Sequence, residues 1–231
     1  MSISLIVPLC ADRPEYEKNM PYLFQFTSEG TSLCIKSILG LNPYKFKNIY
    51  FTILEKHDQK YYLSILLRLQ FKKLGLENAH VIVLKHTTSS QAETIYETIK
   101  QAQIQESIFI KDADCYFEGD FTLTNGIAIY PLDKLDIVNP KNKSYVQLDD
   151  QFYITNIIER KIISRFFNAG GYIFEDANVF CQYYNKLSTL KPLYMSHIVY
   201  DMLLDKIPFR PFEIRNYLDW GNEKIYNYYR I

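Results

Sequence analysis

The chain has 231 residues, of which 48% are hydrophobic and 23% are charged. These proportions exclude an intrinsically disordered protein and suit one α/β domain. The 26 basic and 26 acidic side chains give a formal net charge of zero. The charge balance therefore argues against a nucleic-acid-binding protein, which normally carries a basic excess.

Cysteine usage and the apolar segments indicate the cellular environment. The four cysteines have no zinc-ligand spacing. The first eight residues, Met-Ser-Ile-Ser-Leu-Ile-Val-Pro, lack the basic segment of a secretory signal. No apolar run approaches the ~20 residues of a membrane span. We therefore expect a cytoplasmic protein with free thiols and no membrane span.

Strand and helix patterns alternate through the first half of the chain. Short apolar runs predict strands, and apolar residues at a period of 3.6 predict helices. The predicted strands are Ile3–Leu9, Asn48–Leu54, Val81–Leu84 and Ser107–Lys111, and the predicted helices are Thr31–Leu39, Asp58–Leu74 and Gln91–Gln103. This order predicts a Rossmann-like α/β fold with a mainly parallel sheet flanked by helices. Ligands of such sheets bind beyond the carboxyl ends of the strands.

The last third changes character and adds antiparallel features. Turn residues at Asn125-Gly126 and Asp149-Asp150 predict two hairpins. Further predicted elements are a strand over Phe166–Phe174 and helices over Ala177–Asn185 and Ser196–Leu204. We therefore expect a mixed sheet whose later elements close one side of a pocket.

Two carboxylates follow the fourth predicted strand, at Asp112 and Asp114. Residues two apart in an extended segment point the same way, so the pair could share one divalent cation. Mg²⁺ takes a few carboxylate oxygens, waters and substrate phosphates. A solvated turn is the alternative, and the carboxyl end of a central strand favours the metal. A phosphatase of the haloacid dehalogenase type would carry its Asp-x-Asp motif early in the chain.

Three other segments are candidates for ligand binding. Gln91-Ala92 lies at a helix start preceded by serines, where free N–H groups bind anions, although an ordinary capped helix explains it equally. Glu159-Arg160 precedes a strand whose paired Gly170-Gly171 permits close approach of a ligand, although an exposed turn and a β-bulge would look the same. Asp219, before the single Trp, is a metal ligand or a turn residue.

Taken in this order, the four segments resemble the sugar-phosphate nucleotidyltransferases of the GT-A-like, Rossmann-type fold. The resemblance is greatest to nucleotidyltransferases encoded with bacterial capsule and surface-polysaccharide genes. It implies one domain over 1–231, with a nucleotide-binding half (1–120) and an acceptor-binding half (121–231). Gln91-Ala92 is similar to the family segment near the nucleobase. Asp114 with Phe117 is similar to the Asp-x-x-Phe metal site, with Asp112 as a further contact to metal and nucleotide.

The later segments extend the resemblance to the acceptor. Asp219-Trp220-Gly221-Asn222 resembles the family's late Asp-x-Gly-Thr, whose Asp holds a second Mg²⁺. Glu159-Arg160 resembles a Glu-Lys pair, and Asn168-Ala169-Gly170-Gly171-Tyr172-Ile173-Phe174 resembles the strand that contacts the sugar. The acceptor-binding residues implied by this resemblance are Glu159, Arg160, Asn168, Gly170 and Tyr172.

The segment after the first strand departs from the family pattern. The family has Gly-x-Gly-x-Arg there, whose amides cradle the triphosphate, whereas this chain has Leu9-Cys10-Ala11-Asp12-Arg13-Pro14. The family's Pro-Lys pair falls near Met20-Pro21, which has no lysine. The resemblance then implies nucleotide contacts from Leu9, Cys10, Ala11 and Arg13. It implies catalytic roles for Arg13, Lys18 and Asp114.

The resulting hypothesis is a Mg²⁺-dependent nucleotidyltransferase for surface polysaccharide synthesis. An NTP, CTP or UTP, would react with a sugar phosphate or a similar phosphorylated acceptor and release pyrophosphate. A GT-A glycosyltransferase that uses a nucleotide sugar is the first alternative, since Asp112 and Asp114 form an Asp-x-Asp motif. A catalytically degenerate binding protein is the second, because the glycines are missing. The sequence leaves a homo-oligomer open.

Overall fold

The computed structural model describes residues 2–135 and 140–221 of the chain. The helices are α1 (Leu33–Leu39), α2 (Glu55–Tyr61), α3 (Leu63–Leu74), α4 (Gln91–Ala102), α5 (Ala177–Leu187) and α6 (Met195–Leu204). The strands are β1 (Ile3–Pro8), β2 (Ile49–Leu54), β3 (Ala79–Leu84), β4 (Ser107–Lys111), β5 (Cys115–Glu118), β6 (Gly126–Pro131), β7 (Ser144–Leu148), β8 (Ile154–Glu159), β9 (Phe166–Phe174), β10 (Arg210–Glu213) and β11 (Arg215–Asp219).

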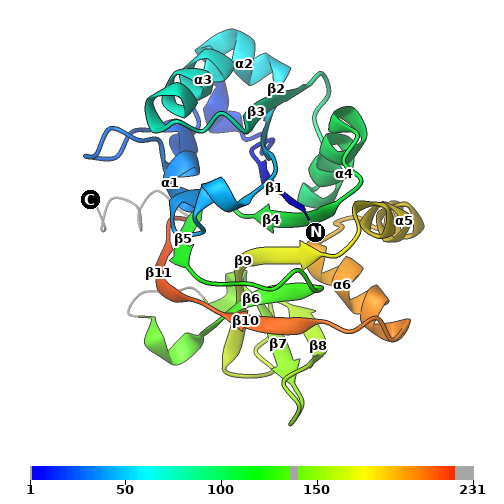
Figure 1. The fold of residues 1–231 in the computed structure, drawn as a ribbon. Coiled ribbons are helices and arrows are strands. Elements are labelled where there is room, and N and C mark those ends of the chain that lie inside the picture. Colours follow the sequence, from blue (N-terminus) through cyan, green and yellow to red (C-terminus); the bar gives the residue numbers. More distant parts are fainter. Residues whose placement is uncertain (1, 136–139, 222–231) are drawn as a thin grey trace.

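Nine of the described strands form one mixed sheet (Figure 1). Its main path runs β10-β6-β9-β4-β1-β2-β3, and β7 and β8 join beside β9. The contacts among β1, β2, β3 and β4 are parallel, as the alternation of strands and helices predicts. β9 is antiparallel to both β4 and β6, so it joins the parallel part to the later strands. The predicted fold class is therefore confirmed.

Alternate side chains of the central strands enter two cores on opposite faces of the sheet. Leu5, Val7 and Phe109 pack in one core with residues of α1 and α3. Ile6 and Ile108 pack in the other core with residues of α4, α5 and α6. Because successive side chains of a strand point to opposite faces, strands covered on both faces must be apolar throughout. Figure 1 shows these two groups of helices on either side of the sheet.

Two predictions of local structure are wrong. The helix expected over Asp58–Leu74 is two helices, because Tyr62 adopts a left-handed conformation with φ of 55°. The Asp58 carboxylate accepts a hydrogen bond from Ser64 N at 2.7 Å, which caps the second helix. The hairpin expected at Asn125-Gly126 does not form, since β6 pairs with β9 and β10 instead. The hairpin at Asp149-Asp150 is confirmed by the antiparallel pair of β7 and β8.

A small second sheet positions the end of the described chain. β5 and β11 pair antiparallel, with Asp219 opposite Cys115. This pairing brings residues about one hundred positions apart to the carboxyl end of β4. Asn222, the last residue of the predicted late motif, lies outside the described residues.

Candidate active site

Two cavities meet at the carboxyl end of β4. The larger, of about 540 Å³, lies over the ends of β1 and β4 and the start of α4. The smaller, of about 180 Å³, lies between the same place and the strands β7, β8 and β9. Gln91, Asp112 and Asp114 line both cavities. The strand order places β1 between β2 and β4, so this is the point where a doubly wound sheet binds its ligands.

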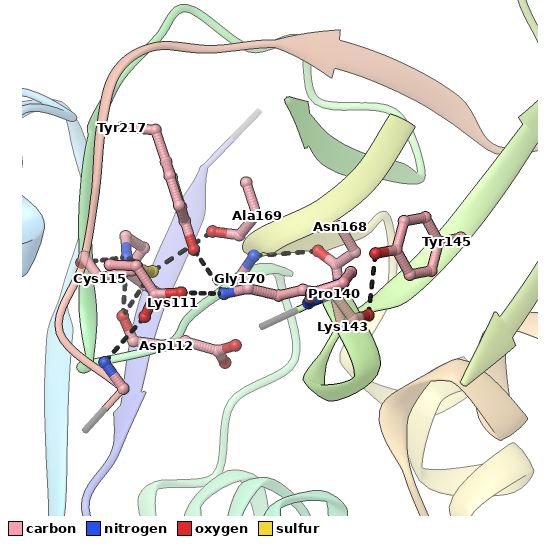
Figure 2. A network of polar contacts seen from close by, with 12 residues as sticks. Lys111, Asp112, Cys115, Pro140, Lys143, Tyr145, Asn168, Ala169, Gly170 and Tyr217 are labelled. Atoms are coloured by element: carbon pink, nitrogen blue, oxygen red, sulfur yellow. Dashed lines mark hydrogen bonds and ion pairs between the residues drawn. The ribbon is translucent and has the colours of Figure 1, made fainter. Parts of the chain in front are cut away.

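The turn that carries both carboxylates is held by backbone hydrogen bonds from two other segments (Figure 2). The N–H of Asp112 donates to the carbonyl of Gly170 on β9 at 2.8 Å. The N–H of Trp220 donates to the carbonyl of Asp114 at 2.7 Å. Gly170 has φ of +81°, and a Cβ there would lie 2.8 Å from Cβ of Asp112. The glycine is therefore required for the close approach of β9 to this turn.

Asp114 lies in an electrostatically unfavourable place for a carboxylate. Burial, with Asp112 as the second cause, raises the pKa of Asp114 to about 6. The Asp219 carboxylate acts in the same direction, and Lys143 and Lys111 oppose it. Like charges close together disfavour ionisation unless a cation compensates them. The three acidic residues expected to converge are thus close enough to influence one another.

Asp219 is already bound by groups of the protein. Its Oδ2 lies 2.6 Å from Nζ of Lys143, and its Oδ1 accepts a hydrogen bond from Gly221 N at 2.8 Å. Lys143 also donates to the hydroxyl of Tyr217 at 2.8 Å. Burial alone would lower the pKa of Lys143, but the neighbouring Asp219 carboxylate reverses that effect and raises it. Lys143 therefore stays charged and is the basic residue that lines the smaller cavity.

The carboxylates of Asp112 and Asp114 suit a magnesium ion, which needs few ligands from the protein. In residues 2–135 and 140–221, no group of three His, Cys, Asp or Glu side chains is arranged to hold a metal. Asp112 and Asp114 nevertheless face the same two cavities. Mg²⁺ needs one or two carboxylates and completes its shell with water and phosphate oxygens. The pair therefore fits Mg²⁺, whereas Asp219 is paired with Lys143 and lines neither of the two cavities.

Gln91 is placed at the junction, in contact with a carboxylate. It is the first residue of α4, which Ser90 caps by accepting from Glu93 N. The Gln91 amide donates to Oδ1 of Asp112. Ala92, the other residue expected to contact the nucleotide, is fully buried in the core beneath α4 and does not line the cavity. The helical period places consecutive residues 91 and 92 on different faces.

Only part of the predicted loop after β1 reaches the larger cavity. Cys10, Ala11 and Arg13 line it, and Arg13 is its one basic lining residue within the described chain. Leu9 is buried in the core, and Lys18 is exposed outside the cavity. Burial raises the pKa of the Cys10 thiol to about 12, so this residue is not a thiolate nucleophile.

The acceptor side brings four of its five predicted residues into the smaller cavity. These are Glu159, Asn168, Gly170 and Tyr172. Asn168 donates through Nδ2 to the Tyr172 hydroxyl, and Glu159 accepts from the Ser196 hydroxyl at 3.0 Å. Arg160 is exposed, and its guanidinium lies over the ring of Tyr194, 5.4 Å from the centroid. Arg160 has a positive φ directly after β8 and does not line the cavity, although its Nε lies 4.0 Å from Oε1 of Glu159.

Several lining residues escaped the sequence analysis. Tyr16 and Tyr22 contribute aromatic walls to the larger cavity, and Lys143 contributes the cation of the smaller one. Tyr16 and Tyr22 lie in single-turn helices that carry no periodic pattern. Lys143 lies directly before β7 in a polar stretch that is typical of an exposed turn. Local sequence gives no signal for these positions, because only the tertiary fold carries them to the cavities.

The chain is similar to solved nucleotidyltransferase structures over almost its whole length. The nucleoside-diphosphate-sugar pyrophosphorylase from Vibrio cholerae RC9 aligns with a TM-score of 0.79 at 14% identity, covering 97% of this chain and 98% of that one. The inositol-1-phosphate CTP transferase from T. maritima aligns with a TM-score of 0.73 at 14% identity, covering 98% and 94%.

A third solved structure agrees with these two. The CTP:phosphocholine cytidylyltransferase from Streptococcus pneumoniae aligns with a TM-score of 0.70 at 13% identity, covering 99% and 97%. No protein-family model and no curated protein sequence matches the chain. At this low identity the similarity establishes the fold. The protein therefore has the fold of the sugar-phosphate and nucleotide-sugar nucleotidyltransferases, as the ordered motifs indicate.

Proposed function

We propose that this protein is a nucleotidyltransferase that joins a nucleotide from an NTP to a phosphorylated small molecule and releases pyrophosphate. The observation that carries the proposal is the position of Asp112 and Asp114, which line both cavities at their junction. A reaction between two bound substrates needs such a junction, because the reacting atoms must meet at one point. The larger cavity would take the NTP and the smaller one the acceptor.

The division of the chain supports this assignment. The larger cavity is lined by residues between Pro8 and Asp114, which fall in the first half of the chain. The smaller cavity is lined mainly by residues between Asn142 and Tyr217, with Gln91, Asp112, Asp114 and Cys115 from the first half. We therefore assign 1–120 to nucleotide binding and 121–231 to acceptor binding.

The residues have distinct roles in the proposed reaction. Asp112 and Asp114 would hold Mg²⁺, which neutralises phosphate charge when bound. Gln91 orients the Asp112 carboxylate by its hydrogen bond. Arg13 would bind phosphate oxygens of the NTP, and Lys143 would face the acceptor phosphate. No protein nucleophile is required, because an oxygen of the acceptor phosphate attacks the α-phosphorus of the NTP directly and pyrophosphate leaves.

Glu159, Asn168 and Tyr172 would bind hydroxyl groups of the acceptor. Burial raises the pKa of Tyr172 well above its ordinary value, so its phenol stays protonated and can donate or accept. The polar partners in this cavity suit a sugar or alditol phosphate. We further infer a cytoplasmic reaction that supplies activated units for surface polysaccharide synthesis, with CTP or UTP as the nucleotide.

The proposal is tested by product formation. The protein is incubated with each NTP, Mg²⁺ and a panel of sugar and alditol phosphates, and released pyrophosphate is measured. The variant Asp114→Asn is expected to lose activity, while Asp133→Asn, at an exposed aspartate paired with Arg165, keeps it. A folded wild-type protein that releases no pyrophosphate with any pair would contradict the proposal.

A GT-A glycosyltransferase is the second candidate, favoured by one observation. The described lining of the larger cavity offers one cation, Arg13, beside the acidic residues Asp12, Asp112 and Asp114. A nucleotide diphosphate sugar carries less negative charge than an NTP and needs fewer cations. Hydrolysis or transfer of a nucleotide sugar without pyrophosphate release would establish this alternative. Failure to bind any nucleotide would instead indicate the degenerate binding protein.

A further inference from the structure

The last residue of β4 is a fully buried lysine. The side chain of Lys111 has 0% exposure. Its ammonium donates to the backbone carbonyls of Asp112 at 2.7 Å and Cys115 at 2.8 Å. It also contacts Sγ of Cys115 at 3.0 Å and lies 4.4 Å from the ring centroid of Phe117. Figure 2 shows Lys111 beside Asp112 and Cys115, within one network of polar contacts.

Stability of the sheet does not explain a lysine at this position. The other residues of β4, from Ser107 to Ile110, are buried as well, and three of them are apolar. Moving an ammonium group out of water costs several kcal/mol even after relaxation of the protein. An apolar side chain would fill the same space without this cost of removing a charge from water. The lysine must therefore do something that an apolar side chain does not do.

The two carbonyl contacts show what the ammonium adds. They belong to residues 112 and 115, so one group closes the turn that contains Asp112 and Asp114. Gly170 and Trp220 bind the turn through their backbones, at Asp112 N and at the Asp114 carbonyl. Lys111 adds side-chain contacts to two further carbonyls, those of Asp112 and Cys115. Without it, both carbonyls would lose the ammonium as a donor, and the loss of a hydrogen-bond partner is costly for a buried polar group.

We propose that Lys111 is a positioning residue, which fixes the turn over residues 112–115 so that the carboxylates of Asp112 and Asp114 face one divalent cation at the junction of the two cavities. This inference rests on the proposed function, since it assumes that the two carboxylates bind a cation. Lys111 acts through the turn and touches neither substrate.

The test measures binding of Mn²⁺, a spectroscopic substitute for Mg²⁺, to the metal-free protein by electron paramagnetic resonance. The variants are Lys111→Met and Lys111→Gln, with Lys47→Met as a control at a half-exposed lysine that lies before β2 and pairs with Glu106. We expect Lys111→Met to weaken Mn²⁺ binding at least tenfold and Lys111→Gln to weaken it less, because the amide keeps an NH₂ group as donor. The control should stay within twofold of the wild type.

The sign of the effect distinguishes positioning from simple electrostatics. Removing a positive charge near two carboxylates would by itself strengthen cation binding. Weaker binding in a folded Lys111→Met variant therefore supports positioning, whereas unchanged or stronger binding overturns it. Failure of both Lys111 variants to fold would show a folding role only and would also overturn it. Absence of Mn²⁺ binding by the wild type would refute the metal site itself, and with it both proposals.

Discussion

The contact between β9 and the carboxylate turn leads to a sharp prediction for Gly170→Ala. Gly170 has φ of +81°, and a Cβ at this position would lie 2.8 Å from Cβ and Oδ2 of Asp112 and 2.9 Å from Sγ of Cys115. Gly75, which ends α3, has a similar φ of +65°, but a Cβ there would meet nothing within 4 Å. Gly75→Ala is therefore a matched control that carries the backbone strain without the collision.

The two substitutions should differ by the cost of the collision. A residue with a Cβ in the left-handed region costs roughly 1–2 kcal/mol, and both variants carry this term. Forcing an extra carbon into a packed site costs roughly 1–3 kcal/mol more. We therefore expect Gly75→Ala to lower the free energy of unfolding by about 1–2 kcal/mol and Gly170→Ala to lower it by about 2–5 kcal/mol.

The assay is urea unfolding followed by circular dichroism, with Mn²⁺ binding measured on the folded variants. Gly170→Ala should also weaken Mn²⁺ binding, because Asp112 must move, whereas Gly75→Ala should leave it unchanged. Equal losses of unfolding free energy in the two variants would refute the reasoning. That result would mean that β9 does not approach the turn as closely as the structure places it.

Four further predictions concern the charged groups of the site. Asp114→Asn should abolish Mn²⁺ binding measured by calorimetry. It should not lower the free energy of unfolding at pH 7, because it removes a buried charge. A stable variant that binds Mn²⁺ normally would contradict the metal assignment. Since burial and Asp112 raise the pKa of Asp114 to about 6, Mn²⁺ affinity should fall roughly tenfold per pH unit below pH 6. In the metal-free protein the same shift should make the free energy of unfolding decrease as the pH rises from 3.8 to about 6, because the folded state holds the proton more tightly. Lys143→Met should lower the free energy of unfolding by about 3–5 kcal/mol, because it leaves the Asp219 carboxylate without its cation. The double variant with Asp219→Asn should recover at least half of that loss. Additive losses in this double-mutant cycle would show that the pair is not coupled.

Features that depend on local pattern were predictable from the sequence. Apolar runs such as Ser107–Lys111 specify buried strands, and their alternation with helices specifies a mainly parallel sheet. The position of Asp112 and Asp114 directly after such a strand places them at the ligand-binding edge. A ligand site beyond the carboxyl ends of the parallel strands then follows from a general rule of α/β sheets.

Features that depend on one backbone conformation were not predictable. The apolar period continues through Tyr62, so the pattern indicates one helix where the left-handed residue makes two. Asn125-Gly126 has the composition of a hairpin turn, but Asn125 instead accepts a hydrogen bond from Glu175 N and docks beside the end of β9. At Asn125 a contact with a distant residue outweighs the local preference, whereas at Tyr62 the hydrogen bond between Asp58 and Ser64 spans the break between the two helices.

The sequence alone therefore determined the layers of the fold and the carboxylates at the end of β4, because the hydrophobic period and the order of elements along the chain are read directly from the sequence. Only the tertiary structure decided which charges surround those carboxylates. Lys143, directly before β7, reaches Asp219 at the end of β11, and Lys111 is buried because the turn after β4 folds back over it. Charge interactions depend on distance through space and on burial, and neither quantity is encoded in the spacing of residues along the chain.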